Sequence, residues 1–282
     1  MVISVQDITS VNSQNKIMVV NNNSNQNILL IGSCRITPFL NYLMNYDLFG
    51  NKFNYLCVLV HVPEMIQLSE NVLFNDEIKN QISCSTILFS EYIQSYNYFN
   101  TCKHQEKSIY TIHKNFNYEI LLPNCDRMYL YTNDLIKCKN LKNYLCKLHN
   151  NEISFQEFTN ILKNTHENEL QRHFDVLIKA NFLELIDFTK NHLHKVKLSH
   201  TFNHPSNYYF LEMFRLVLEK YFNTNYIPQI IIDINNSCEF LGNMNDIKLT
   251  YYDSICLGIN INNVKYLDLN ESNEYLLNDN YG

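Results

Sequence analysis

The chain of 282 residues has no tryptophan and only five glycines and five prolines. Its remaining composition is that of an ordinary globular protein, with 46% apolar and 18% charged residues. Asparagine is unusually common instead, at about one residue in six. AT-rich codons explain this bias more simply than function does, so we interpret the cluster at residues 21, 22, 23 and 25 as solvated turn residues.

Three further absences exclude classes of protein. No stretch is strongly basic and the formal net charge is -6, so nucleic acid is not an expected partner. The nine cysteines include no pair at zinc-ligand spacing, and we expect free thiols in a reducing, cytoplasm-like compartment. Neither a signal peptide nor membrane insertion is expected, because the chain shows no basic-then-apolar leader and no apolar run of about 18 residues.

The first half of the chain has the pattern of an α/β protein. A β-prone segment at 17–20 is followed by a continuous apolar run at 27–31, which is typical of a strand buried on both faces. Two similar runs follow at 55–60 and 86–89. Their spacing, with helical patterns between them, predicts βαβ units and a mostly parallel sheet, with a site at the carboxyl ends of its strands.

The second half is predicted to be helical first and β-rich at its end. Residues 133–187 and 210–222 carry apolar side chains at helical spacing, and we interpret the first of these stretches as a layer of helices covering the sheet. Short strands are expected at 230–234, 247–252 and 255–261. We therefore expect a main domain over 1–225 and, over 226–282, a β-rich annex or a linker to a further domain.

The bend after the first buried strand is the first candidate site. Gly32, Ser33, Cys34 and Arg35 follow this strand, and Thr37 with Pro38 predicts a helix that begins directly after them. The amide groups at a helix start favour an anion, and a cysteine there tends to have a lowered pKa. The alternative is a turn of small residues that serves only strand-helix packing.

The second candidate is His204, which precedes Pro205 and another helical pattern. A nearby helix start favours a neutral imidazole, as a general base requires, and Asn203 could orient that ring or donate to an oxyanion. The alternative is a capping or packing histidine. We expect His192, His194 and His200 to be exposed surface residues, and we expect no zinc site among them.

These and other segments together resemble the WcbI-like family of polysaccharide-biosynthesis proteins. Gly-Ser-Cys-Arg at 32–35 is similar to the family's Gly-Asn-Cys-Gln, and Phe-Asn-His-Pro-Ser at 202–206 matches a family signature in full. Between them, the segments at 90–96, 123–129 and 169–176 resemble further family segments in the same order. The likeness covers roughly residues 27–222. Ser33, Arg35 and His173 depart from the family's usual Asn, Gln and Glu.

The resemblance implies a coenzyme A-binding α/β protein, with a layout similar to SGNH-type esterases, that acylates a sugar or sugar nucleotide for a surface glycan. His204 would be the general base, and the backbone of Ser33 and Cys34, with Asn203, would hold the oxyanion. A variant route places the acyl group on Cys34. The residues expected to bind coenzyme A or acetyl-CoA are Gly32, Arg35, Arg172 and Ser206.

Two other functions stay open at this point. The first is an SGNH-type carbohydrate esterase or deacetylase, which would release acetate without coenzyme A. The second is a non-catalytic glycan-binding module, which the 20 tyrosines favour. The acceptor sugar, the acyl length and the formation of a homo-oligomer are not decided by the sequence.

Overall fold

The computed structural model describes residues 17–59, 76–91, 115–125, 128–138, 141–201, 204–237, 248–262 and 264–277. The chain divides into two compact units, each built from two chain segments. Unit 1 comprises Met1–Asn124 and Phe210–Phe240, and unit 2 comprises Cys125–Tyr209 and Leu241–Gly282. The expected division after residue 225, between a functional domain and an annex, stays a prediction.

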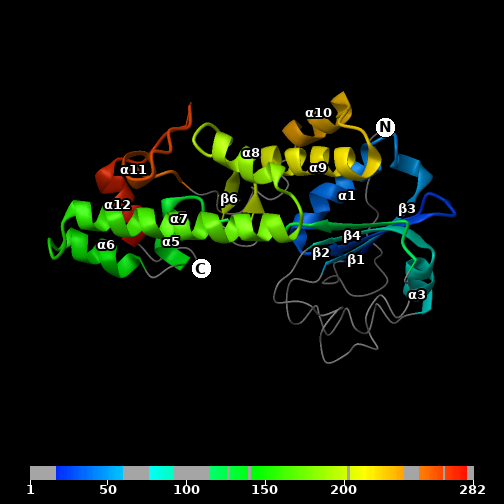
Figure 1. Ribbon diagram of the computed structural model, residues 1–282, viewed down its shortest axis with the longest axis horizontal. Helices are drawn as coiled ribbons and strands as arrows, with labels where there is room; N and C mark the ends of the chain where they lie inside the picture. Colours follow the sequence, from blue (N-terminus) through cyan, green and yellow to red (C-terminus); the bar gives the residue numbers. More distant parts are fainter. Residues whose placement is uncertain are drawn as a thin grey trace. The chain divides into compact units, whose positions relative to one another are not determined.

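Unit 1 holds a five-stranded sheet in the order β1-β3-β2-β4-β5 (Figure 1). Strand β1 is antiparallel to β3, and the other neighbouring strands are parallel. The expected α/β class with a mostly parallel sheet is therefore confirmed. The strands are β1 (Ile17–Val20), β2 (Asn27–Gly32), β3 (Asn54–Leu59), β4 (Ser85–Glu91) and β5 (Tyr118–Leu122).

Strand β2 lies at the centre of this sheet, and all six of its residues are buried. Its continuous apolar run is what a strand needs when it is covered on both faces. The start of the following helix differs from expectation. Ser33 caps a 3-10 helix, η1 (Cys34–Ile36), and Thr37 is already the first residue of α1 (Thr37–Asn45).

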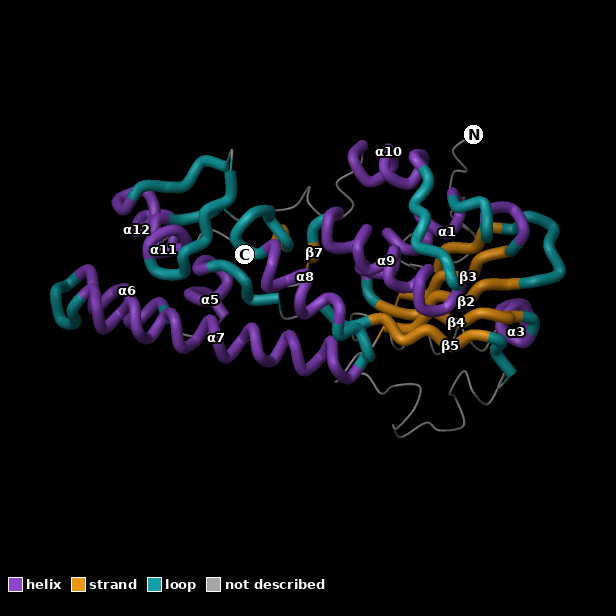
Figure 2. The backbone as a smooth tube through the Cα atoms, turned by 45° about the horizontal axis from the view of Figure 1, so that its top comes forward, coloured by secondary structure: helices purple, strands orange, loops and turns teal. Residues whose placement is uncertain are grey.

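Helices α1 and α10 (Gln229–Ser237) lie with the unit 1 part of α9 (Asn207–Phe222) on one side of the sheet (Figures 1 and 2). The contact is aromatic: the ring of Phe214 lies 5.9 Å from that of Phe39 and 5.1 Å from that of Tyr42. The Tyr42 hydroxyl donates to Asn235 Oδ1 at 2.7 Å, which ties α1 to α10. Unit 1 also contains α3 (Asp76–Ser83) and a second 3-10 helix, η2 (Gly50–Lys52).

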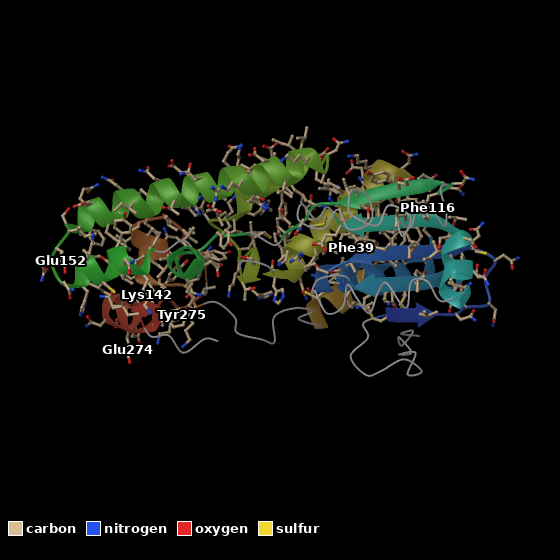
Figure 3. All side chains as sticks on the ribbon, turned by 90° about the horizontal axis from the view of Figure 1, so that it is seen from below. Phe39, Phe116, Lys142, Glu152, Glu274 and Tyr275 are labelled. Carbon is tan, nitrogen blue, oxygen red and sulfur yellow. The ribbon has the colours of Figure 1, made fainter. Side chains whose placement is uncertain are left out.

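Unit 2 is mainly helical and has a core of its own. Side chains that include Leu145, Phe158, Tyr252 and Leu276 form this core. Figure 3 shows the α6 and α12 region, with Lys142 and Tyr275 labelled. The elements of unit 2 are α5 (Thr132–Cys138), α6 (Lys142–His149), α7 (Phe155–Lys179), α8 (Glu184–His192), β6 (Ser199–Thr201), β7 (His204–Pro205), α11 (Tyr251–Ile255) and α12 (Leu269–Leu277).

The buried carboxylate of Asp253 joins the two chain segments of unit 2. Its Oδ1 accepts from the Thr132 amide at 2.7 Å, at the start of α5. Its Oδ2 accepts from the amide and the hydroxyl of Thr250, at 2.7 and 2.8 Å, in the capping box of α11. One side chain thus satisfies amide groups at the starts of two helices.

The expected β-rich annex is wrong for the described residues after 225, which contain α10, α11 and α12 and no strand. The strand expected at 230–234 is part of a helix, and a short apolar run such as this one does not by itself separate strand from helix. Pro228 decides the matter, because its carbonyl oxygen accepts from the amides of Ile231 and Ile232 and so starts a helix. Ile231 and Asn235, four residues apart, are then the buried positions.

Asparagine takes over a role that glycine usually has. The described non-glycine residues with positive φ are all asparagine: Asn23, Asn151, Asn181 and Asn223. Asn tolerates the left-handed conformation better than most residues because its side chain hydrogen-bonds locally. Asn181 and Asn223 follow the ends of α7 and α9 closely, where helices commonly end on such a residue.

Among the described residues, no helix combines the length and apolarity needed to cross a membrane.

Candidate functional site

The bend after β2 lies at the carboxyl end of the central strand of unit 1. Strand β4 runs parallel beside β2, with Ile31 opposite Ser90, so that Glu91 ends β4 next to the bend. Gly32 ends β2, Ser33 caps η1, and Cys34 is the first residue of that short helix. The structure therefore brings Gly32, Ser33, Cys34 and Arg35 together where a site was expected.

Glu91 holds this bend through both of its carboxylate oxygens. Oε2 accepts from the Ser33 amide at 2.8 Å and from the Ser33 hydroxyl at 2.7 Å. Oε1 accepts from Arg35 Nε at 2.6 Å. The side chain of Glu91 is only 4% exposed, so these contacts replace almost all of the water around the charge.

Gly32 is explained by the same carboxylate. A Cβ atom at this position would lie 3.0 Å from both Cβ and Oε2 of Glu91 and 3.3 Å from Cβ of Ile36. These distances are shorter than most Cβ contacts, so a side chain here would have to push its neighbours away. Glycine at the end of β2 thus lets Glu91 approach the bend.

Arg35 connects the bend to a third strand. Besides its ion pair with Glu91, it donates from Nη2 to Oδ1 of Asn124 at 3.1 Å, two residues beyond the end of β5. The side chain of Arg35 is 10% exposed. Its charge is thus directed inward to Glu91, and this positioning role was not foreseen from the sequence.

Cys34 and Ser33 differ in what they can offer to a ligand. The Ser33 hydroxyl is buried, donates to Glu91 and accepts from the Arg35 amide at 3.3 Å. Cys34 is half-buried. Because the Ser33 amide also donates to Glu91, the oxyanion role expected of that amide conflicts with the observed hydrogen bond.

The second predicted motif lies in unit 2. His204 begins β7 and pairs with Thr201 of β6, while Asn203 lies outside the described residues. Ser206 is buried, and its amide donates to the carbonyl oxygen of Leu198 at 2.9 Å. His204 is half-buried and stands on a short two-stranded ribbon.

Tyr209 connects the segment around His204 with the family-like segment 169–176 on α7. Its amide donates to Oγ of Ser206 at 3.4 Å, and its hydroxyl lies 3.1 Å from Nε2 of His173. His173 is buried, and burial lowers its pKa to about 4, so the ring is neutral at physiological pH. Unit 2 therefore brings together two segments that the family resemblance had selected separately.

Arg172, which directly precedes His173 on α7, is exposed. Its Nη1 forms an ion pair with Oε1 of Glu169 at 2.6 Å, and its side chain is 60% exposed. On the same helix His166 is buried, and its Nε2 lies 3.1 Å from the carbonyl oxygen of Leu130. Burial lowers the pKa of His166 to about 4.

The expectation for the neighbouring histidines is correct for His194 only. His194 is exposed, but His192 is half-buried, with its ring stacked on Phe188 at 4.4 Å, and His200 is buried on β6. His200 stands on a strand with buried neighbours, which the spacing of polar residues did not indicate. The described residues contain no group of three or more potential metal ligands.

Sequence reasoning assigned no role to Glu91, Asn124 or Tyr209. Glu91 and Asn124 lie in segments that resemble the family. The sequence signal that could have identified Glu91 is a carboxylate directly after a buried apolar run. No single-sequence pattern shows that Tyr209 reaches His173, 36 residues away.

Comparisons with known proteins add no relative: no family model, no curated protein and no solved structure matches this chain.

Proposed function

We propose that the protein is an acyltransferase that moves an acyl group, most simply acetyl, from coenzyme A to a sugar or sugar nucleotide. One observation carries the proposal: a half-buried cysteine stands at the start of a helical turn, at the carboxyl end of the central strand of a mostly parallel sheet. Ligands bind at this edge of such sheets, and a thiol there can act as a nucleophile towards an acyl carbon. The ordered family-like segments supply the substrate class.

The state of Ser33 supports a thiol over a serine nucleophile. A serine that attacks a carbonyl carbon needs an accessible hydroxyl and a base that accepts its proton. The Ser33 hydroxyl is buried and donates to a carboxylate that is itself paired with Arg35. This arrangement weighs against a serine esterase, and it leaves Cys34 as the reactive group of the bend.

Two routes of transfer fit this proposal. In the direct route the acceptor attacks the thioester carbon while a base takes its proton. In the covalent route the Cys34 thiol gives its proton to the base, its sulfur bonds to the acyl carbon, and coenzyme A takes that proton and leaves as a thiol. The acceptor then loses its own proton to the base and attacks the acyl carbon, and the Cys34 sulfur leaves and is protonated again. On the strength of the sequence signature, we propose His204 as the base in either route and Asn203 as a donor to the oxyanion.

The phosphate groups of coenzyme A need cationic partners, and the two expected arginines do not fit equally well. Arg172 is 60% exposed and keeps guanidinium donors beyond the one that contacts Glu169. Arg35 is 10% exposed and is paired with Glu91. We therefore propose Arg172 as the phosphate ligand, Ser206 as a further coenzyme A ligand on the strength of the sequence signature, and Arg35 as a structural residue.

The remaining parts of the proposal concern context. We propose an SGNH-like layout for the catalytic region, an amino sugar carried on a nucleotide as the acceptor, and a reducing, cytoplasmic location. The free cysteines of the described residues are compatible with that location.

The test is acyl transfer itself. The purified chain is incubated with acetyl-CoA and a panel of nucleotide sugars, and release of coenzyme A and the masses of the sugars are followed. We expect Cys34→Ala to lower turnover by at least about tenfold, while Cys84→Ala, which alters an exposed cysteine of the same unit, leaves it unchanged. No release by the wild type contradicts the proposal, and equal turnover in both variants excludes the covalent route through Cys34.

A further inference from the structure

We infer that Glu91 is a positioning residue: it fixes Ser33 and thereby sets the exposure and orientation of Cys34. The carboxylate is the acceptor for the amide and the hydroxyl of Ser33, at 2.8 and 2.7 Å. These two bonds hold the residue that directly precedes Cys34. The inference deepens the proposed function, on which its catalytic part rests.

The close approach of Glu91 is built into the sequence around it. Gly32 leaves room for this carboxylate, because a Cβ atom there would lie 3.0 Å from Oε2 of Glu91, closer than most Cβ contacts. Arg35 compensates the charge at 2.6 Å and is itself held by Asn124. Residues at the ends of β2, β4 and β5 thus fix the position of the Glu91 carboxylate, and this carboxylate in turn holds the bend after β2.

The geometry separates two tasks of Glu91. Oε1 takes part in the ion pair with Arg35, while Oε2 accepts from Ser33. The ion pair holds the side chain of Arg35, whereas the bonds to Ser33 hold the backbone directly before Cys34. The positioning task belongs to the oxygen that faces Ser33, and it does not require a charge on that oxygen.

Two charge-free double variants distinguish the tasks. Glu91→Gln with Arg35→Met removes the ion pair but keeps an oxygen that can accept from Ser33. Glu91→Met with Arg35→Met removes the ion pair and the acceptor together. A buried ion pair can be replaced by uncharged side chains when both partners are exchanged, so the comparison isolates the acceptor oxygen.

The readout is the alkylation rate of Cys34 by iodoacetamide, measured by peptide mass spectrometry on the full chain, with exposed Cys84 as the internal reference. Without the acceptor the half-buried thiol becomes more exposed, and we expect its rate relative to Cys84 to rise at least about fivefold. The variant that keeps the oxygen should react at the wild-type rate. In the acyl-transfer assay, the variant without the acceptor loses kcat with little change in the KM for acetyl-CoA.

Unchanged Cys34 rates in both variants would overturn the inference, and so would an equal rise in both, which would assign the effect to the ion pair. If a double variant does not fold, Ser33→Ala decides, because it removes the hydroxyl bond and leaves the ion pair in place. We expect it to raise the Cys34 rate about twofold, and no rise would count against Glu91. Alkylation requires no acyl-CoA, so an absence of transferase activity would sink the proposed function and leave this result standing.

Discussion

Two buried sites, one in each unit, keep their ionisable side chains in opposite states. In unit 1 Glu91 and Arg35 are buried as charges that compensate each other at 2.6 Å. In unit 2 His166 and His173 are buried as neutral rings, because burial lowers the pKa of each to about 4. The stability of the site in unit 1 therefore depends on both members of the ion pair being present. The stability of the site in unit 2 depends on pH, because its histidines must stay neutral.

The largest effect is expected when the ion pair of unit 1 loses one member. Arg35→Ala leaves the Glu91 carboxylate buried without its partner and should lower the free energy of unfolding by about 3 to 5 kcal/mol. Urea denaturation of the full chain measures it. Arg215→Ala is the matched control on α9, because its ion pairs with Glu212 and Glu219 are partly exposed and should contribute less than about 1 kcal/mol. Similar losses in both variants would remove the distinction.

The next effect concerns the neutral histidines of unit 2. Their unfolded pKa is about 6.5, so the unfolded chain binds more protons than the folded chain as pH falls from about 6.5 towards 4. The free energy of unfolding should fall over this window, by up to about 3 kcal/mol for each histidine. His173→Leu should flatten the pH dependence, and Phe174→Leu, which changes a neighbouring non-titrating residue, should keep it. An unaltered slope in His173→Leu would show that the ring does not titrate as described.

A smaller effect is expected on turnover, and it tests the role of His204 on the β6–β7 ribbon of unit 2. His204→Ala should lower the rate of acyl transfer about a hundredfold, which corresponds to roughly 2.7 kcal/mol of transition-state stabilisation. Affinity for coenzyme A should change little. His194→Ala, which alters an exposed histidine of the same unit, should leave the rate unchanged. Normal turnover without His204 would end its assignment as the base.

The smallest effect is expected at Gly32, whose missing side chain leaves room for the Glu91 carboxylate. Gly32→Ala places a methyl group 3.0 Å from the carboxylate and must displace it, which should cost about 1 to 3 kcal/mol and lengthen the bonds to Ser33. Thermal unfolding and Cys34 alkylation follow both consequences. A variant as stable and as slowly alkylated as the wild type would mean that the carboxylate has room to move.

The sequence predicted unit 1 better than the end of the chain. The run at 27–31 is continuous and apolar, and such a pattern fits a central parallel strand and little else when Gly32 and a helix start follow. The run at 230–234 is equally apolar, but Pro228 turns it into a helix. The capping box at Thr250 and Asp253 was a readable helix signal that the strand prediction overlooked.

The sequence predicts which residues form the bend of the candidate site, but it does not predict the distant residues that contact them. Gly32 to Arg35 form the bend that their spacing indicated, because a strand end and a helix start define it locally. The partners Glu91 and Asn124 lie 58 and 89 residues from Ser33 and Arg35, respectively, and only the parallel order of the strands brings them close. The same holds for His173 and Tyr209, whose pairing depends on the packing of α7.

Binding of acetyl-CoA is the first requirement of the proposed function, and calorimetric titration of the full chain measures it. Arg172→Ala is the test variant, and Lys179→Ala, which alters another exposed cation of α7, is the control. The account predicts saturable binding to the wild type, affinity at least about tenfold weaker in Arg172→Ala, and unchanged affinity in Lys179→Ala. Absence of heat together with an unshifted melting temperature at millimolar acetyl-CoA would contradict the account.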